Sequence, residues 1–122
     1  MNYKFKFKEE NSNIELRKKD CDKIRKDYSN KIPIICEKDS NKPNLQEIDK
    51  SKFLVPDDLQ VSQFSSMIRQ RINIDNKKAI YLLFAGQYSV TMDATMSEVY
   101  EKFKDPEDGF LYVIYSCEET WG

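Results

Sequence analysis

The chain opens on alternating aromatic and charged residues and then takes on a helical period. Ser12-Asn-Ile-Glu15 has the form of a capping box, which predicts a helix from there to about Tyr28. Four apolar residues recur at helical spacing and are expected to face the core: Ile14, Cys21, Ile24 and Tyr28. The alternation over residues 3–8 indicates either a short separate helix or an extended segment before this helix.

Two strands are predicted next, separated by a polar loop. Residues 31–37 form an apolar run, and Pro33 within it lacks an N–H. We therefore expect this strand to lie at a sheet edge, or the proline to lie at its very start. Residues 52–55 form a second strand that Pro56 stops. The two runs together predict an antiparallel hairpin with a wide turn.

The second half of the chain alternates between helical and strand patterns. Residues 61–73 carry a helical stripe composed of Phe64, Met67, Ile68 and Ile72. Residues 79–84 are continuously apolar, which predicts a central strand. Thr95-Met-Ser-Glu98 is a second capping box that opens a short helix, and residues 110–116 form the last strand. This order is typical of an α+β fold with one mixed sheet.

Length and composition narrow the class of protein. The chain has 122 residues, 39% apolar and 34% charged, which fits one globular domain. We divide it into a helical part (1–28), a sheet core (29–116) and a flexible C-terminal tail (117–122). No apolar run is long enough for a membrane span, and the charged start is unlike a signal peptide.

The residue types present argue against catalysis. There is no histidine, and no acid–base or nucleophile constellation is visible, so we expect no enzyme, no metal site and no cofactor. The sequence has three cysteines, Cys21, Cys36 and Cys117, which are far apart in the chain. Their odd number and wide spacing favour reduced, inert thiols in the cytosol.

Charge is unevenly distributed although the net charge is −1. Residues 1–56 carry 14 Lys and Arg against 10 Asp and Glu, whereas residues 57–122 carry 6 against 11. A basic N-terminal half suits acidic peptides or anionic surfaces. The asymmetry is too small to indicate nucleic acid binding, and we expect a monomer.

Several segments resemble the autophagy ubiquitin-like modifiers, the autophagy-related protein eight family that includes GABARAP. The resemblance runs from about Asp20 to Gly122. It rests on the segments 23–28, 32–38, 49–56, 63–64, 68–69, 71–72, 94–96 and 110–112, on Tyr100, and on the terminal aromatic residue followed by glycine. It implies a ubiquitin-like β-grasp, a four-stranded mixed sheet with two extra N-terminal helices. Ala85-Gly86 departs from the family, which usually has an asparagine pair there.

The resemblance implies a function for the chain end. Glycine has no Cβ, so a terminal Gly122 can pass through a narrow channel and serve as an acyl donor. Activating and conjugating enzymes would join it to phosphatidylethanolamine on autophagosomal or phagosomal membranes, and a cysteine protease would release it. The protein would otherwise be cytoplasmic. Trp121 fits recognition by those enzymes.

The resemblance also implies a docking site for cargo receptors that carry short aromatic-x-x-aliphatic motifs. The first pocket would be lined by Asp20, Ile24, Pro33, Ile35, Lys52, Leu54 and Phe110. The second would be lined by Phe53, Val55, Leu59, Phe64, Met67, Ile68 and Arg71. Lys31 and Lys50 would form a basic rim that attracts flanking acids.

Simpler interpretations stay open. Taken singly, the apolar residues of both pockets could be ordinary core, and the lysines could be solvated surface. A non-conjugated trafficking or cytoskeletal adaptor would need the groove but not Gly122. A modifier of protein lysines would use the same terminal chemistry.

Overall fold

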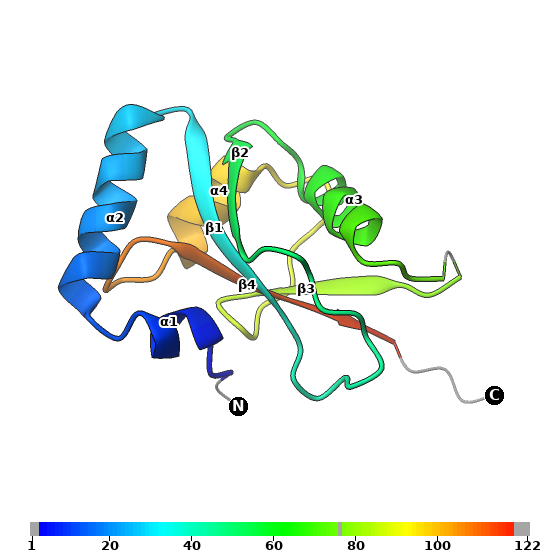
Figure 1. Cartoon of the computed structure of the whole chain (residues 1–122). Helices are drawn as coiled ribbons and strands as arrows, with labels where there is room; N and C mark the ends of the chain where they lie inside the picture. The colour runs from blue at the N-terminus through cyan, green and yellow to red at the C-terminus, as the bar shows by residue number, and fades with distance from the viewer. Residues whose placement is uncertain (1–2, 76, 119–122) are drawn as a thin grey trace.

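The computed structural model describes residues 3–75 and 77–118, which fold around one mixed sheet (Figure 1). The strands are β1 (Lys31–Lys38), β2 (Lys52–Pro56), β3 (Ile80–Phe84) and β4 (Leu111–Cys117). The helices are α1 (Lys6–Glu10), α2 (Ile14–Asp27), α3 (Val61–Arg71) and α4 (Met96–Phe103). The strand order is β2-β1-β4-β3, with β1 and β4 parallel and the other neighbours antiparallel. The predicted α+β class and four-stranded mixed sheet are confirmed.

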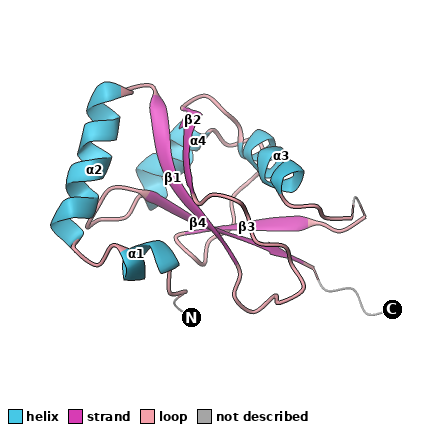
Figure 2. Ribbon diagram, viewed as in Figure 1, coloured by secondary structure: helices cyan, strands magenta, loops and turns pink. Residues whose placement is uncertain are grey.

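Each face of the sheet carries its own buried cluster, because side chains alternate along a strand. Ile32, Ile34 and Cys36 of β1 belong to the cluster that includes the buried residues of α3 and α4. Ile35 belongs to the other cluster, with Phe5, Cys21, Phe110, Tyr112 and Ile114. Figure 2 shows α1 and α2 on one side of the sheet and α3 on the other.

The expectation that Pro33 marks an edge strand or a strand start is wrong, since β1 lies between β2 and β4 and Pro33 is its third residue. The pairing of β1 with β4 begins only at Ile34. Pro33 is paired with Leu54 of β2. Its nitrogen points away from β2, toward the β4 side of β1, at a position where the pairing with β4 has not begun. The missing N–H therefore removes no ladder hydrogen bond.

The third strand is not central, as its apolar sequence suggested, but lies at the edge of the sheet. β4 takes the central place beside it. The side chains of β3 alternate between buried and accessible, and Tyr81 is exposed. In this apolar run, one row of side chains faces the core and the alternate row is only partly buried. A continuous run of apolar residues in the sequence does not distinguish the two rows.

α2 differs from its predicted form at both ends. Its N-cap is Asn13 rather than Ser12, and the Asn13 side chain accepts from the Leu16 N–H. Ile14 and Tyr28 were expected in the core but are 43% and 52% exposed. They stand at the two ends of the helix, whereas the buried centre of α2 consists of Arg17 and Cys21.

Other local expectations hold. The hairpin of β1 and β2 forms, and Thr95 and Glu98 make the predicted reciprocal capping box of α4. α3 ends two residues earlier than predicted, and the last strand is displaced by one residue. The three cysteines carry free thiols. In the described part of the chain, no helix has the length and apolar character that crossing a membrane requires. Trp121 and Gly122 lie outside the described residues.

Candidate peptide-binding site along the free edge of β2

β2 is the second edge strand of the sheet, paired only with β1 among the described strands. In an antiparallel pair, residues alternate between those that bond the neighbour and those that face away. The Cys36 N–H donates to the Ser51 carbonyl over 2.8 Å, so residue 51 bonds across to β1. The alternate residues Lys52 and Leu54, which are paired with Ile35 and Pro33, therefore direct their backbone N–H and C=O outward. These groups form an open ladder along β2.

The residues expected in the first pocket gather on the face of the sheet that carries α2. Asp20 and Ile24 come from α2, Pro33 and Ile35 from β1, and Lys52 and Leu54 from β2, with Phe110 just before β4. Leu54 is 39% exposed, whereas Ile35 and Phe110 are fully buried. The site thus has an accessible wall formed by Leu54 and a floor that belongs to the core.

Lys52 covers this first site. Its Nζ lies 2.6 Å from Oδ2 of Asp20, so an ion pair spans from β2 to α2. The same ammonium lies 5.6 Å from the ring centroid of Phe110 and 5.8 Å from that of Phe7. The Lys52 ammonium therefore lies over the aromatic part of this floor.

The residues expected in the second pocket gather on the opposite face, beneath α3. Phe53 and Val55 come from β2, Leu59 from the following loop, and Phe64, Met67, Ile68 and Arg71 from α3. Four of them are fully or nearly fully buried: Phe53, Val55, Phe64 and Ile68. Leu59 and Met67 are partly accessible and form the outer part of this site.

Cations also cover the second site. Nη1 of Arg71 donates to both carboxylate oxygens of Asp49 over 3.0 and 3.1 Å. The Arg71 guanidinium lies 5.4 Å from the Phe53 ring, and the ammonium of Lys50 lies 4.9 Å from it. These cation–π contacts place the positive charges of Arg71 and Lys50 over the Phe53 ring.

The basic residues do not form one continuous rim. Lys50 and Lys52 stand at the start of β2, whereas Lys31 pairs with Pro56 at its other end. Lys31 is half-buried, and its carbonyl accepts from Nη1 of Arg25 over 2.7 Å. Lys50 and Lys52 therefore place positive charge at the start of β2, and Lys31 lies on β1 near the other end of the pair.

Two contributors were missed at the sequence level. Phe7 of α1 joins the floor of the first site, and its ring stands 5.5 Å from that of Phe110. Asp49 holds Arg71 from the loop before β2. The aromatic alternation of residues 3–8 contained the signal for Phe7, but no local pattern identifies Asp49 as the partner of Arg71.

Comparisons with known proteins agree with this architecture. A family model described as autophagy protein Atg8, ubiquitin-like, matches residues 16–122. Autophagy-related protein 8 of Neurospora crassa is 48% identical over 117 residues, which cover 96% of this chain and 93% of that protein. Its Aspergillus niger counterpart is 47% identical over 117 residues, which cover 96% of each chain.

A solved structure gives the same result. The crystal structure of Trypanosoma brucei ATG8 superposes with a TM-score of 0.85 at 39% identity, covering 98% of this chain and 100% of the other. At that identity and coverage, the likeness extends beyond the fold to the sequence that builds it. The chain belongs to the Atg8 family of ubiquitin-like autophagy proteins.

Proposed function

We propose that this protein is a ubiquitin-like modifier that is conjugated through Gly122 to phosphatidylethanolamine on autophagosomal or phagosomal membranes. There it recruits receptors with aromatic-x-x-aliphatic motifs along β2. Family membership supports the conjugation, and the free edge of β2 between two apolar sites carries the recruitment.

The spacing of the motif fits the two faces of β2. An extended peptide that pairs with the outward-facing backbone of Lys52 and Leu54 would extend the sheet by one strand. Side chains three positions apart in an extended strand point to opposite faces. An aromatic residue directed at Leu54 and Phe110 would thus have its aliphatic partner directed at Leu59 and Met67.

Displacing the covering cations costs little. The Lys52–Asp20 and Arg71–Asp49 pairs are substantially solvent-exposed, and such pairs contribute about 0–1 kcal/mol. Burying one large apolar side chain contributes about 1.5–3 kcal/mol. A released Lys52 would also be available for acidic residues that flank the motif.

Conjugation would require partners that handle the C-terminus. An activating enzyme, a conjugating enzyme and a delipidating cysteine protease would act on Gly122, and the attached lipid would hold an otherwise cytoplasmic protein at the membrane.

A peptide titration tests the groove. We expect Leu54→Ala combined with Lys52→Glu to weaken a fluorescent aromatic-x-x-aliphatic peptide by about tenfold or more, which equals about 1.4 kcal/mol. Both residues are exposed, so the fold should persist. Tyr81→Ala on the opposite edge strand is the matched control and should leave the binding curve unchanged. Equal curves for the wild type and the double variant would remove the groove assignment.

Deletion of Gly122 tests the conjugation separately. The truncated protein should bind the same peptide normally yet lose membrane association in cells, and mass spectrometry of the membrane-bound wild type should detect the phospholipid at the terminus. Wild-type membrane association of the truncated protein would instead favour a non-conjugated adaptor.

A further inference from the structure

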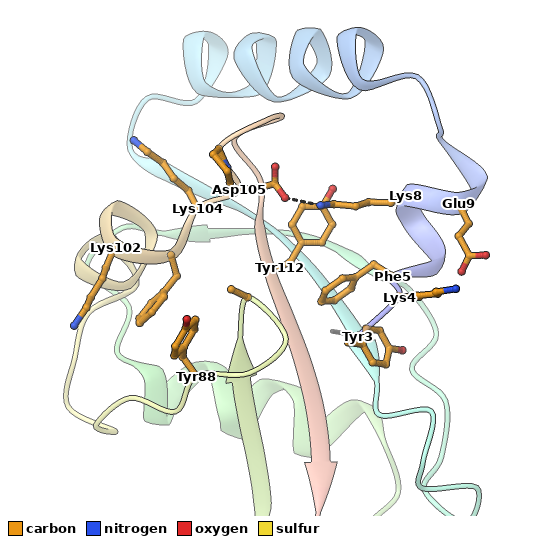
Figure 3. A pocket seen from close by; sticks show the side chains of 13 residues that line it. Tyr3, Lys4, Phe5, Lys8, Glu9, Tyr88, Lys102, Lys104, Asp105 and Tyr112 are labelled. Atoms are coloured by element: carbon orange, nitrogen blue, oxygen red, sulfur yellow. Dashed lines mark hydrogen bonds and ion pairs between the residues drawn. The ribbon is translucent and has the colours of Figure 1, made fainter. Parts of the chain in front are cut away.

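A second groove, of about 630 Å³, lies away from the β2 edge on the face that carries α1. It forms where the segment before α1 meets the end of α4, the start of β4 and the turn after β3 (Figure 3). None of the residues expected to bind the receptor motif lines it. Its volume is within the range of about 300–1,000 Å³ that is typical of ligand sites.

Aromatic rings form the walls of this groove. On one side, the Phe5 and Tyr112 rings lie 4.9 Å apart. On the other, Tyr88 and Phe103 stack with centroids 5.1 Å apart. Figure 3 shows Tyr88 across from Phe5 and Tyr112. Phe5 and Tyr112 are buried, so their wall of the groove is recessed, whereas Tyr88 on the opposite wall is 48% exposed.

Lysines surround these rings, and their charge is only partly neutralised. Lys8 is engaged, because its Nζ lies 2.5 Å from Oδ2 of Asp105 and 4.7 Å from the Tyr112 ring centroid. Burial opposes the charged form of Asp105, but the Lys8 ammonium together with the backbone N–H groups of Glu107 and Asp108 lowers the pKa of that carboxyl. Asp105 therefore remains an anion committed to Lys8.

The remaining charges favour an anionic ligand. Lys4, Lys102 and Lys104 are exposed at the rim, and Glu9 is the other carboxylate among the described lining residues. Lys104 contacts Glu101 at 3.5 Å, but both side chains are solvent-exposed, so this pair is weak. Lys102 lies 5.5 Å from the Phe103 ring, next to the aromatic wall.

The shape discriminates between two kinds of anionic partner. A flat bilayer surface is bound by apolar side chains that protrude together, whereas here the Phe5 and Tyr112 rings form the buried wall of a hollow. A hollow is filled by a side chain that projects from the partner. A peptide segment satisfies both the recess and the rim.

We propose that this groove binds an acidic segment of a partner protein, with one large apolar side chain inserted between Phe5 and Tyr88 and with carboxylates on Lys4, Lys102 and Lys104. The groove and the β2 edge involve different residues. A single molecule could therefore hold a receptor motif at β2 and a second acidic segment here.

A labelled peptide with one phenylalanine flanked on each side by three glutamates tests the proposal by fluorescence anisotropy. Lys102→Glu with Lys104→Glu should weaken its binding by about tenfold or more, because two attractive contacts become repulsive. Lys19→Glu with Lys26→Glu on the solvent side of α2 changes the net charge equally and should change the affinity by less than about twofold. Lys52→Glu should have no effect, so failure here is distinguishable from failure of the β2 site.

Two further arms identify the ligand chemistry. Replacing the peptide phenylalanine by serine, or Tyr88 by serine in the protein, should abolish most of the binding. If Lys102→Glu with Lys104→Glu and Lys19→Glu with Lys26→Glu lowered the peptide affinity equally, the binding would be non-specific electrostatic attraction and the proposal would be overturned. So would binding to phosphatidylserine vesicles that depends on Lys102 and Lys104 while the peptide fails to bind.

Discussion

Arg17 of α2 donates through Nε to Oδ2 of Asp108 over 2.8 Å, and the two side chains are only 4% and 0% exposed. Asp108 also accepts from the Tyr112 hydroxyl over 2.5 Å and from the Phe110 N–H over 2.9 Å. Burial opposes the charge on Arg17 and is the largest single influence, but the hydrogen bond to Asp108 together with the negative charges around it raises the Arg17 pKa. The pair fixes α2 to the loop that leads into β4.

Removing one partner of this pair should strongly destabilise the fold. Arg17→Ala leaves Asp108 as a buried, unpaired anion, and such losses cost about 3–5 kcal/mol. Urea unfolding of the variant measures the change. Lys18→Ala on the exposed face of the same helix, where its ion pair with Asp22 is solvated, is the control and should cost less than about 1 kcal/mol. Similar values for the two variants would contradict the role given to Asp108.

Gly109 leaves room for Cys21. Its φ is +85°, and a Cβ placed there would lie 3.1 Å from Sγ of Cys21. Gly109→Ala should therefore lower the free energy of unfolding by more than about 1 kcal/mol. In a Cys21→Ala background the sulfur is gone, and the same substitution should cost less.

A double-mutant cycle isolates this contact, because its coupling term contains only what the two sites share. Gly86→Ala is the matched control, since Gly86 also has a positive φ but its added Cβ would meet Tyr3. Its cost should not depend on residue 21. A zero coupling between Cys21 and Gly109 would show that only the backbone conformation constrains Gly109.

Ala85 has a φ of +55°, the one positive φ at a non-glycine residue in the described part of the chain. This conformation is unfavourable for a residue with a Cβ. Ala85→Gly should raise stability by about 0.5–1 kcal/mol. Ala79→Gly, at an exposed alanine without a positive φ, should lower it. Thermal and urea unfolding should move in opposite directions for the two variants, and a common direction would contradict the strain.

The cysteines should differ in reactivity with pH. Burial raises the pKa of the Cys21 thiol to about 11, and it raises that of Cys36 as well. Because the thiolate is the nucleophile, Cys21 should be inert near neutral pH and react only as the pH approaches that value. Cys117 is partly accessible. Iodoacetamide labelling followed by peptide mass spectrometry should detect Cys117 first. Equal rates at neutral pH would contradict this order.

Elements that depend on neighbouring residues followed from the sequence. The capping box of Thr95 and Glu98 and the stripe of Phe64, Ile68 and Ile72 both appear in the structure. Each signal lies within a few residues, where helical geometry alone decides which groups meet. The likeness to the autophagy modifiers was also in the sequence, and the comparisons confirmed the family.

Tertiary pairing decided the rest. The position of β3 at the edge depends on which strand β4 joins, and the burial of Arg17 depends on an aspartate 91 residues away. The closure of the two β2 sites by Lys52 and Arg71 depends on Asp20 and Asp49 from other elements. Local periodicity specifies which residues prefer to be buried. It does not specify which distant group compensates a buried charge, because that partner is brought close only when the sheet assembles.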